Sequence, residues 1–276
     1  MSYFIYNGIP VDKDSPLFPA SSRSYRYGDG FFESMKVSEG RLMHGYLHQL
    51  RIDKSLLLLK MQAPECFEHS SLEDQIERFC KSKKISNARV RATYLREADG
   101  FYQPKNQYTQ VLVEISPIEY SGYPLNTEGY IVGNYKELVK NSNFISTLKT
   151  NSSLIYTMAG IYAKENDLDE CILYNEFGRV CEGISCNIFM VSGEFITTPP
   201  LSEYCVDGVM RKLVLQLAQS YGYQINERPI QEIDLMTADE LFFTSATRGI
   251  QWVGNYMGKS FRSTIAKVLS DKLSEN

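Results

Sequence analysis

The stretch that divides this sequence in two is SPIEYSGYPLNT, residues 116–127. It contains Pro117 and Pro124 together with the turn signal Ser-Gly-Tyr-Pro at 121–124, and the hydrophobic periodicity of the flanking segments stops there. We therefore interpret this stretch as a linker. It predicts two domains, residues 1–120 and residues 121–276.

On both sides of the linker, hairpin signals are mixed with helical patterns. A plain doubly wound sheet would require strands and helices to alternate strictly, so we predict an α/β (α+β) protein with mixed sheets and with helices in both domains. In the first domain we expect strands at 1–6, 36–37, 41–43, 88–94 and 110–115, and helices at 46–61 and 71–82. In the second domain we expect strands at 130–134, 170–175, 187–191, 194–197, 240–244 and 250–253, and helices at 152–166, 208–221 and 263–273.

Composition narrows the class of protein. The 276 residues are 43% hydrophobic and 22% charged, with a net charge of −4, which is ordinary for a globular protein and gives no electrostatic footprint for nucleic acid. Three histidines, and six cysteines without a Cys-x-x-Cys pair, argue against a metal site. The first residues lack a secretory signal, and the longest aliphatic run, Leu56–Leu59, is too short to cross a bilayer. We expect a cytoplasmic protein with free thiols and no membrane contact.

Lys149 is the first candidate for chemistry. It follows the extended segment Ile-Ser-Thr-Leu at 145–148 and precedes a polar turn and a helix. Burial lowers the pKa of a lysine, which suits the amine to covalent chemistry with a carbonyl. Taken alone, the same pattern also fits a surface lysine in a turn.

Three further segments could bind an anionic ring compound. Glu182 begins a run of small and polar residues between two strands, where a carboxylate could pair with a protonated ring nitrogen. The segment 207–211, Asp-Gly-Val-Met-Arg, opens a helix with glycine, so its backbone N–H groups could bind an anion. Arg51 could contact a phosphate in bidentate fashion. Taken singly, each segment is equally typical of an element with no functional role: an exposed turn, a capped helix or a solvated helix face.

Together, and in this order, the motifs resemble the class IV aminotransferases, which are the fold type IV pyridoxal-phosphate enzymes. That family includes branched-chain aminotransferases, D-amino acid aminotransferases and aminodeoxychorismate lyases. The resemblance runs from about residue 5 to residue 253. The motifs that carry it are 27–33 (YGDGFFE), 48–51 (HQLR), 148–150 (LKT), 182–189 (EGISCNIF), 198–201 (TPPL), 208–211 (GVMR) and 244–249 (TSATRG).

The resemblance implies a role for each matching residue. The cofactor would be pyridoxal 5′-phosphate, which Lys149 would hold as an aldimine before it moves the proton at the substrate Cα. Glu182 would keep the pyridine nitrogen protonated, so that the ring acts as an electron sink. Arg51 and the backbone N–H groups of Val209 and Met210 would bind the phosphate.

A later segment, 245–247, matches the family's last phosphate contact with one departure. The position that is threonine in many aminotransferases is Ala246 here, so either Ser245 or Thr247 would supply the hydroxyl or this contact would be lost. On the substrate side, Arg96 matches the arginine with which the D-amino acid enzymes trap the substrate carboxylate, whereas Phe32 stands in place of the tyrosine of that trap and Ala98 in place of its histidine. We expect Arg96 to lie on a loop of the first domain that reaches across the interface of a homodimer.

The reaction remains open between two members of the family. The first is a transaminase acting on an amino acid or an amino-bearing acid. The alternative is 4-amino-4-deoxychorismate lyase, which releases pyruvate and 4-aminobenzoate for folate synthesis; the Gly-Val-Met-Arg turn and the Ser245–Ala246 pair favour it. A second alternative is an inactive binding protein on the same scaffold, although the presence of Lys149, Glu182 and Arg51 together argues against it.

Overall fold

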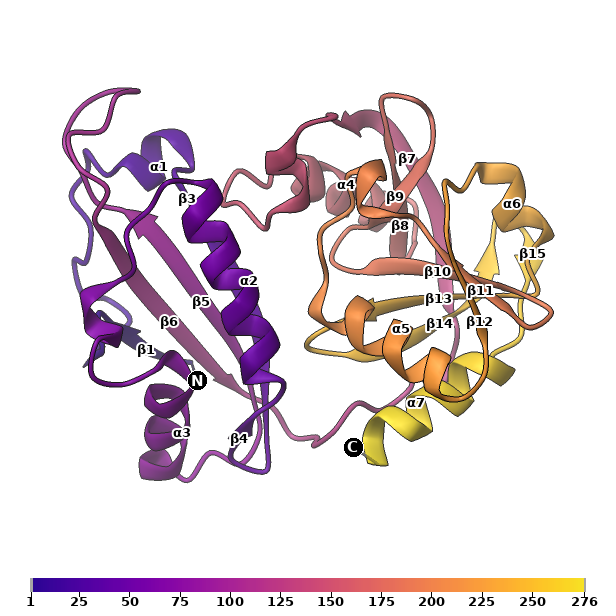
Figure 1. Ribbon diagram of the computed structural model, residues 1–276, viewed down its shortest axis with the longest axis horizontal. Coiled ribbons are helices and arrows are strands. Elements are labelled where there is room, and N and C mark those ends of the chain that lie inside the picture. The colour runs from indigo at the N-terminus through magenta and orange to yellow at the C-terminus, as the bar shows by residue number, and fades with distance from the viewer. Residues whose placement is uncertain (1, 276) are drawn as a thin grey trace. The chain divides into compact units, whose positions relative to one another are not determined.

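The computed structural model describes residues 2–275 and divides them into two compact units (Figure 1). Unit 1 comprises residues 1–122 with 149–152, and unit 2 comprises residues 123–148 with 153–276. The mixed α/β class predicted from the sequence is confirmed. The segment 149–152, which the sequence placed in the second domain, packs with unit 1. Within residues 2–275, no helix combines the length and apolarity that crossing a membrane requires.

Unit 1 is built on a six-stranded sheet whose strand order is β2-β1-β6-β5-β3-β4, with neighbours antiparallel. Helices α2 and α3 pack on one face of it, and Figure 1 shows α2 lying along the central strands. The strands are β1 (Tyr3–Tyr6), β2 (Ile9–Val11), β3 (Gly30–Ser38), β4 (Arg41–Leu42), β5 (Ala88–Arg96) and β6 (Thr109–Pro117). The helices are α1 (Arg23–Tyr27), α2 (Gly45–Leu58), η1 (Glu65–Phe67) and α3 (Leu72–Lys83).

Alternation along the central strands decides which residues enter the core of unit 1. Phe31, Met35 and Val37 of β3 are buried against Ile52 of α2 and Ile76 of α3. Phe32, Ser34 and Lys36 alternate with these residues and therefore point to the opposite face of the sheet, because side chains of a strand alternate between its faces. β3 begins six residues before the strand expected at Lys36, inside the motif 27–33.

Unit 2 contains a nine-stranded mixed sheet, with the order β12-β11-β10-β13-β14-β7-β8-β9 and with β15 paired to β14. Helix α4 packs on β7 and β8, and α5 and α7 lie side by side against β13 and β14 (Figure 1). The strands are β7 (Tyr130–Lys140), β8 (Glu170–Asn175), β9 (Val180–Gly183), β10 (Asn187–Ser192), β11 (Phe195–Thr198), β12 (Gln224–Glu227), β13 (Glu240–Ser245), β14 (Gly249–Tyr256) and β15 (Lys259–Ser260). The helices are η2 (Phe144–Thr147), α4 (Leu154–Glu165), η3 (Leu201–Glu203), α5 (Val209–Ser220), α6 (Glu232–Thr237) and α7 (Thr264–Glu275).

Strand β7 is six residues longer than the strand expected at 130–134. It pairs in parallel with β14 on one side and with β8 on the other, and its last pair is Lys140 with Asn175. Pairing with a neighbour, which the local sequence pattern does not reveal, extends the strand through its polar end. This extension brings Lys140 into the interior of unit 2.

Candidate active site

The segment that contains Lys149 is fastened to the first strand of the sequence motif. The Phe32 N–H donates to the Lys149 carbonyl at 2.9 Å, and the Asn151 N–H donates to the Gly30 carbonyl at 3.0 Å. Gly30 is required here, because a Cβ at this position would lie 2.1 Å from the Tyr94 carbonyl oxygen. Lys149 is therefore held beside β3 by backbone hydrogen bonds.

The ring of Phe32 lies next to two cations. Lys149 Nζ is 4.5 Å from the ring centroid, and the Arg91 guanidinium carbon is 3.5 Å from it. Arg91 stands on β5, directly opposite Ser34 of β3, and it is partly buried. Sequence reasoning missed Arg91. The sequence pattern that could have indicated this residue is the alternation of Arg89, Arg91 and Thr93 with apolar residues. This alternation places the Arg91 side chain on the face of β5 away from the core.

Arg96 does not have the position that the sequence predicted. It is the last residue of β5 rather than part of a loop, and it is buried. Its Nε donates to both oxygens of Asp29 at 3.1 Å, its Nη2 donates to the Leu59 carbonyl at 2.6 Å, and its Nη1 bonds Gln107 and the Lys60 carbonyl. These contacts use all three nitrogens of the guanidinium, so Arg96 ties β5 to neighbouring segments of unit 1.

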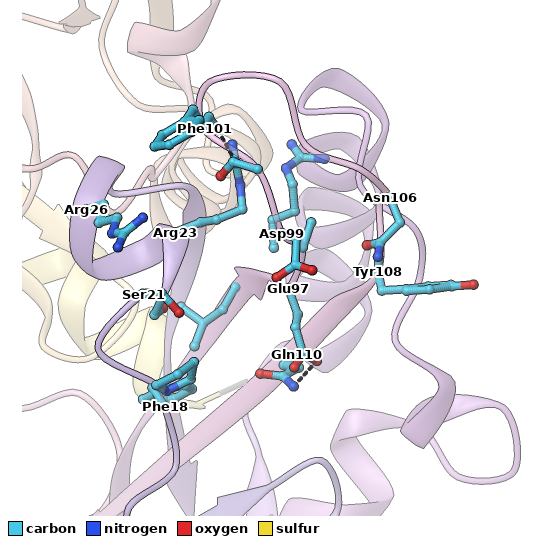
Figure 2. Close-up of a pocket in the computed structure, with 16 residues that line it drawn as sticks. Phe18, Ser21, Arg23, Arg26, Glu97, Asp99, Phe101, Asn106, Tyr108 and Gln110 are labelled. Carbon is cyan, nitrogen blue, oxygen red and sulfur yellow. Dashed lines mark hydrogen bonds between the residues drawn. The ribbon is translucent and has the colours of Figure 1, made fainter.

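A cavity of about 430 Å³ lies beside Arg96, between the segments 18–26 and 95–110 of unit 1 (Figure 2). Charges of both signs line it, including Arg26, Glu97 and Asp99. Neither Phe32 nor Lys149 is among its lining residues. It is therefore a hollow separate from the face that carries Lys149.

Arg51 belongs to a buried ionic cluster between α2 and β3. Its Nε and Nη2 donate to Glu33 at 2.6 and 2.7 Å, and His48 Nδ1 lies 2.8 Å from the same carboxylate. Burial by itself raises the pKa of Glu33, but Arg51 and His48 outweigh burial and lower the pKa to about 2. Glu33 thus fixes two of the five N–H donors of Arg51.

In unit 2, Glu182 is a buried carboxylate at the centre of a hydrogen-bond network. Its Oε1 accepts from Lys140 Nζ and, at 2.8 Å, from the Tyr156 hydroxyl, and its Oε2 accepts from the Val206 N–H at 2.8 Å. Lys140 and Tyr156 come from β7 and α4, and no sequence motif indicated either residue. Val206 lies two residues before Gly208, the glycine that precedes α5.

The N-terminus of α5 begins at Val209, with Gly208 as the preceding residue and no side chain capping it. Asn187 explains the glycine, because a Cβ at position 208 would lie 2.0 Å from its Oδ1. The Asn187 amide donates to the Val206 carbonyl at 2.9 Å. The first N–H groups of a helix have no partner inside the helix, so those of Val209 and Met210 are suited to an anion.

The segment 245–247 joins the end of β13 to β14. Thr244, paired with Asn187 across β10 and β13, has a buried hydroxyl with no hydrogen-bond partner anywhere in residues 2–275. Ser245, Ala246 and Thr247 follow it and are partly buried. Asn187 therefore brings three of the predicted segments of unit 2 together: Glu182 with Val206, the start of α5, and the end of β13.

Comparison with known proteins decides the family, because the sequence matches the model for amino-transferase class IV over residues 30–256. The chain belongs to the class IV aminotransferase family. D-alanine aminotransferase of Bacillus licheniformis is 24% identical over 271 residues, which cover 94% of this chain and 90% of that protein. Aminodeoxychorismate lyase of Bacillus subtilis is 28% identical over 243 residues, covering 85% and 80%.

The fold is likewise that of solved members. A hypothetical aminotransferase from Mycobacterium tuberculosis, in its PLP-bound form, superposes with a TM-score of 0.83 at 19% identity, covering 98% of this chain and 97% of that chain. This class IV aminotransferase-like chain is an enzyme, and its cofactor is pyridoxal 5′-phosphate.

The Glu33 cluster predicts how unit 1 responds to acid. Because Glu33 has a lower pKa folded than unfolded, its contribution to stability is complete above the unfolded pKa of about 4.3 and is lost as the pH falls towards about 2. At pH 7, Glu33→Gln should lower the free energy of unfolding by roughly 3–5 kcal/mol, since it leaves buried cations without their anion. Between pH 4.5 and 2 the variant should lose less stability than the wild type. Denaturant unfolding across this pH range tests both statements, with the exposed Glu65→Gln as control; equal pH slopes in wild type and Glu33→Gln would contradict them.

Proposed function

We propose that this enzyme transfers the amino group of an amino acid to a keto acid, with Lys149 as the residue that binds pyridoxal 5′-phosphate covalently. The observation that carries the proposal is that two cationic side chains, Lys149 and Arg91, lie against the same aromatic ring, that of Phe32. The Lys149 amine and the Arg91 guanidinium contact one ring on one face of the sheet of unit 1. An amine beside an arginine suits a substrate that has a reacting Cα next to a carboxylate.

The residues of both units suit the cofactor. The uncapped start of α5 at Val209 and Met210, and the orphaned hydroxyl beside Ser245, offer donors for a phosphate. We assign Arg51, Val209, Met210 and the turn 245–247 to the phosphate, with hydroxyls from Ser245 and Thr247 and the backbone of Ala246. We assign Glu182 to the ring nitrogen, because a buried carboxylate favours a protonated partner.

When bound, the cofactor supplies an electron sink for the substrate Cα. The chain then has three tasks. Lys149 would move the proton between the substrate Cα and the C4′ carbon of the cofactor, Glu182 would keep the ring nitrogen protonated, and Arg91 would hold the substrate carboxylate. Phe32 presents an apolar ring to the substrate. The role that the sequence suggested for Arg96 passes to Arg91, because the guanidinium of Arg96 is engaged inside unit 1.

An assay of both candidate reactions tests the proposal. Purified holoenzyme is incubated with L- and D-amino acids in turn, each with 2-oxoglutarate, and glutamate is measured; a parallel incubation with aminodeoxychorismate is assayed for pyruvate. We expect glutamate from at least one amino acid, and a loss of several orders of magnitude in Lys149→Ala, which should still bind the cofactor without a covalent bond. Transamination would be ruled out if no amino acid gave glutamate while aminodeoxychorismate gave pyruvate.

The lyase stays the second candidate, supported by the similarity of the Bacillus subtilis enzyme over most of both chains. The Gly208–Arg211 segment also places Met210 in the first turn of α5, where it is buried. Both reactions begin with proton removal at Cα, so Lys149 would serve either one.

Substitution of Arg91 tests whether Arg91 or Arg96 binds the substrate carboxylate. Arg91→Met should raise KM for the amino acid about 10- to 100-fold, because the substrate carboxylate loses a charged hydrogen bond worth ~1.5–3 kcal/mol. The value of kcat should change much less. Steady-state kinetics provide the measurement, and Arg89→Met is the matched control, since Arg89 is an exposed arginine two residues away on the same strand. If Arg96→Met raised KM and Arg91→Met did not, Arg96 would be the anchor.

We also propose that the enzyme is a homodimer in the cytoplasm. Helix α2 exposes Tyr46, Leu50 and Leu57, with exposed fractions of 74%, 45% and 76%. Their spacing places them along one side of the helix, and an apolar face of this kind suits a second copy of the chain. The cysteines are free thiols, as in proteins of reducing compartments.

Sedimentation velocity tests the assembly. We expect the wild type to sediment as a dimer and Leu57→Glu to shift towards monomer, because a charge enters the apolar face. Val268→Glu, at an exposed apolar position on α7 of unit 2, is the control and should remain dimeric. A wild-type monomer with full activity would refute the proposal.

A further inference from the structure

Lys140 is a charged residue buried in the interior of unit 2. Only 5% of it is exposed, although lysine is rarely buried unless it is paired. It ends β7, and its amine reaches across β8 to the carboxylate of Glu182 on β9. Burying this charge costs desolvation free energy. The Lys140–Glu182 pair therefore calls for an explanation other than stability.

The amine has three acceptors and therefore a fixed orientation. Besides Glu182 Oε1, it donates to the Ser146 carbonyl and to the Tyr156 hydroxyl, both at 2.9 Å. Burial alone would lower the pKa of Lys140, but the adjacent Glu182 and Tyr156 outweigh burial and raise it, so the amine stays charged. Burial, followed by the charge of Glu182, raises the pKa of Tyr156, so its hydroxyl stays a donor.

The carboxylate of Glu182 can accept about four hydrogen bonds. Within residues 2–275 it receives three from side chains and backbone: two on Oε1, from Lys140 and Tyr156, and one on Oε2, from Val206. The remaining capacity lies on Oε2. A protonated ring nitrogen placed there would be farther from Lys140 than the carboxylate itself is.

This asymmetry decides where a shared proton resides. A proton between Glu182 and a ring nitrogen has two positions, either on the nitrogen, giving an ion pair, or on the carboxylate, giving two neutral groups. A buried site without other charges favours the neutral arrangement, because charges are poorly solvated there. Lys140 attracts the ionised carboxylate more strongly than it repels the more distant ring cation, since the Coulomb energy falls with distance.

We propose that Lys140, assisted by Tyr156, is a positioning residue that keeps Glu182 ionised and thereby keeps the proton on the ring nitrogen of the cofactor. The inference rests on the proposed function, in which Glu182 contacts that nitrogen. This role would explain why the Lys140–Glu182 pair is buried: the lysine determines the protonation of the ring nitrogen through Glu182, without contacting the substrate.

The experiment reads the proton directly. Apoenzyme is loaded with pyridoxal 5′-phosphate labelled with ¹⁵N in the ring, and the ¹⁵N chemical shift of the ring nitrogen is recorded. Lys140→Met should move the shift from the protonated towards the neutral value, and Tyr156→Phe should move it the same way by less. Lys140→Arg keeps the charge and should stay close to the wild type. Lys136→Met is the matched control, because Lys136 is an exposed lysine of the same strand, and its carboxylate partner, Glu232, is only partly buried.

Kinetics and stability complete the test. Exchange of the Cα proton of an amino acid into deuterated water should slow about tenfold in Lys140→Met, or ~1.4 kcal/mol in the barrier. A lysine that is merely structural would lower the melting temperature and leave the ¹⁵N shift unchanged. That result would overturn the proposal. Should Lys140→Met fail to fold or to take up the cofactor, Tyr156→Phe decides, and an unchanged shift in that variant would overturn it equally.

Glu182→Gln separates this inference from the proposed function. If Glu182→Gln moves the ¹⁵N shift and Lys140→Met does not, Glu182 keeps its role and the role of Lys140 is refuted. If neither variant moves the shift, Glu182 does not contact the ring nitrogen, and both proposals fail at that residue.

Discussion

Two backbone hydrogen bonds between β3 and the segment 149–152 fix the position of Lys149, the residue to which we assign the covalent bond with the cofactor. The chain leaves unit 1 after residue 122, forms β7 and η2 of unit 2, returns to unit 1 for four residues and then begins α4. During that return, the amide of Phe32 donates to the Lys149 carbonyl and the carbonyl of Gly30 accepts from the Asn151 N–H, so the two bonds flank Thr150, the residue after Lys149. These bonds use backbone atoms only and hold the segment that contains Lys149 against β3, and the missing side chain of Gly30 lets β3 and β5 approach.

Buried ion pairs recur around the residues assigned to the cofactor. Arg51 is paired with Glu33 in unit 1, and Glu182 is paired with Lys140 in unit 2, each pair being almost completely buried. Replacing such a pair with apolar residues is often neutral or stabilising in other proteins, so stability alone explains them poorly. Orientation explains them better. The pairs fix the direction of the guanidinium that we assign to the phosphate and of the carboxylate that we assign to the ring nitrogen.

The sequence predicted the family, the cofactor and the fold class because the residues involved lie in short motifs with fixed order. The positions of the other site residues could not be predicted, because they depend on contacts between segments that are distant in the sequence. Arg96 looked like a loop residue, but the side chain of Asp29, the carbonyls at 59–60 and the side chain of Gln107 bind its guanidinium. Arg91 was missed: the alternation in β5 is visible in the sequence, but the contact between Arg91 and the ring of Phe32 on the neighbouring strand is not. Lys140 was missed because β7 continues beyond residue 134 through pairing with β8, which no local pattern signals. The assignments of individual residues to the cofactor remain predictions.

Lys149, which is partly buried, is the residue to which we assign the covalent bond with the cofactor, rather than one of the fully buried lysines. Borohydride reduction of the holoenzyme makes that bond permanent, and peptide mapping by mass spectrometry then locates the modified lysine. We predict that the modification lies on Lys149 alone. Modification of Lys140 or Lys36, the two most deeply buried lysines of the described chain, with Lys149 unmodified, would contradict this assignment.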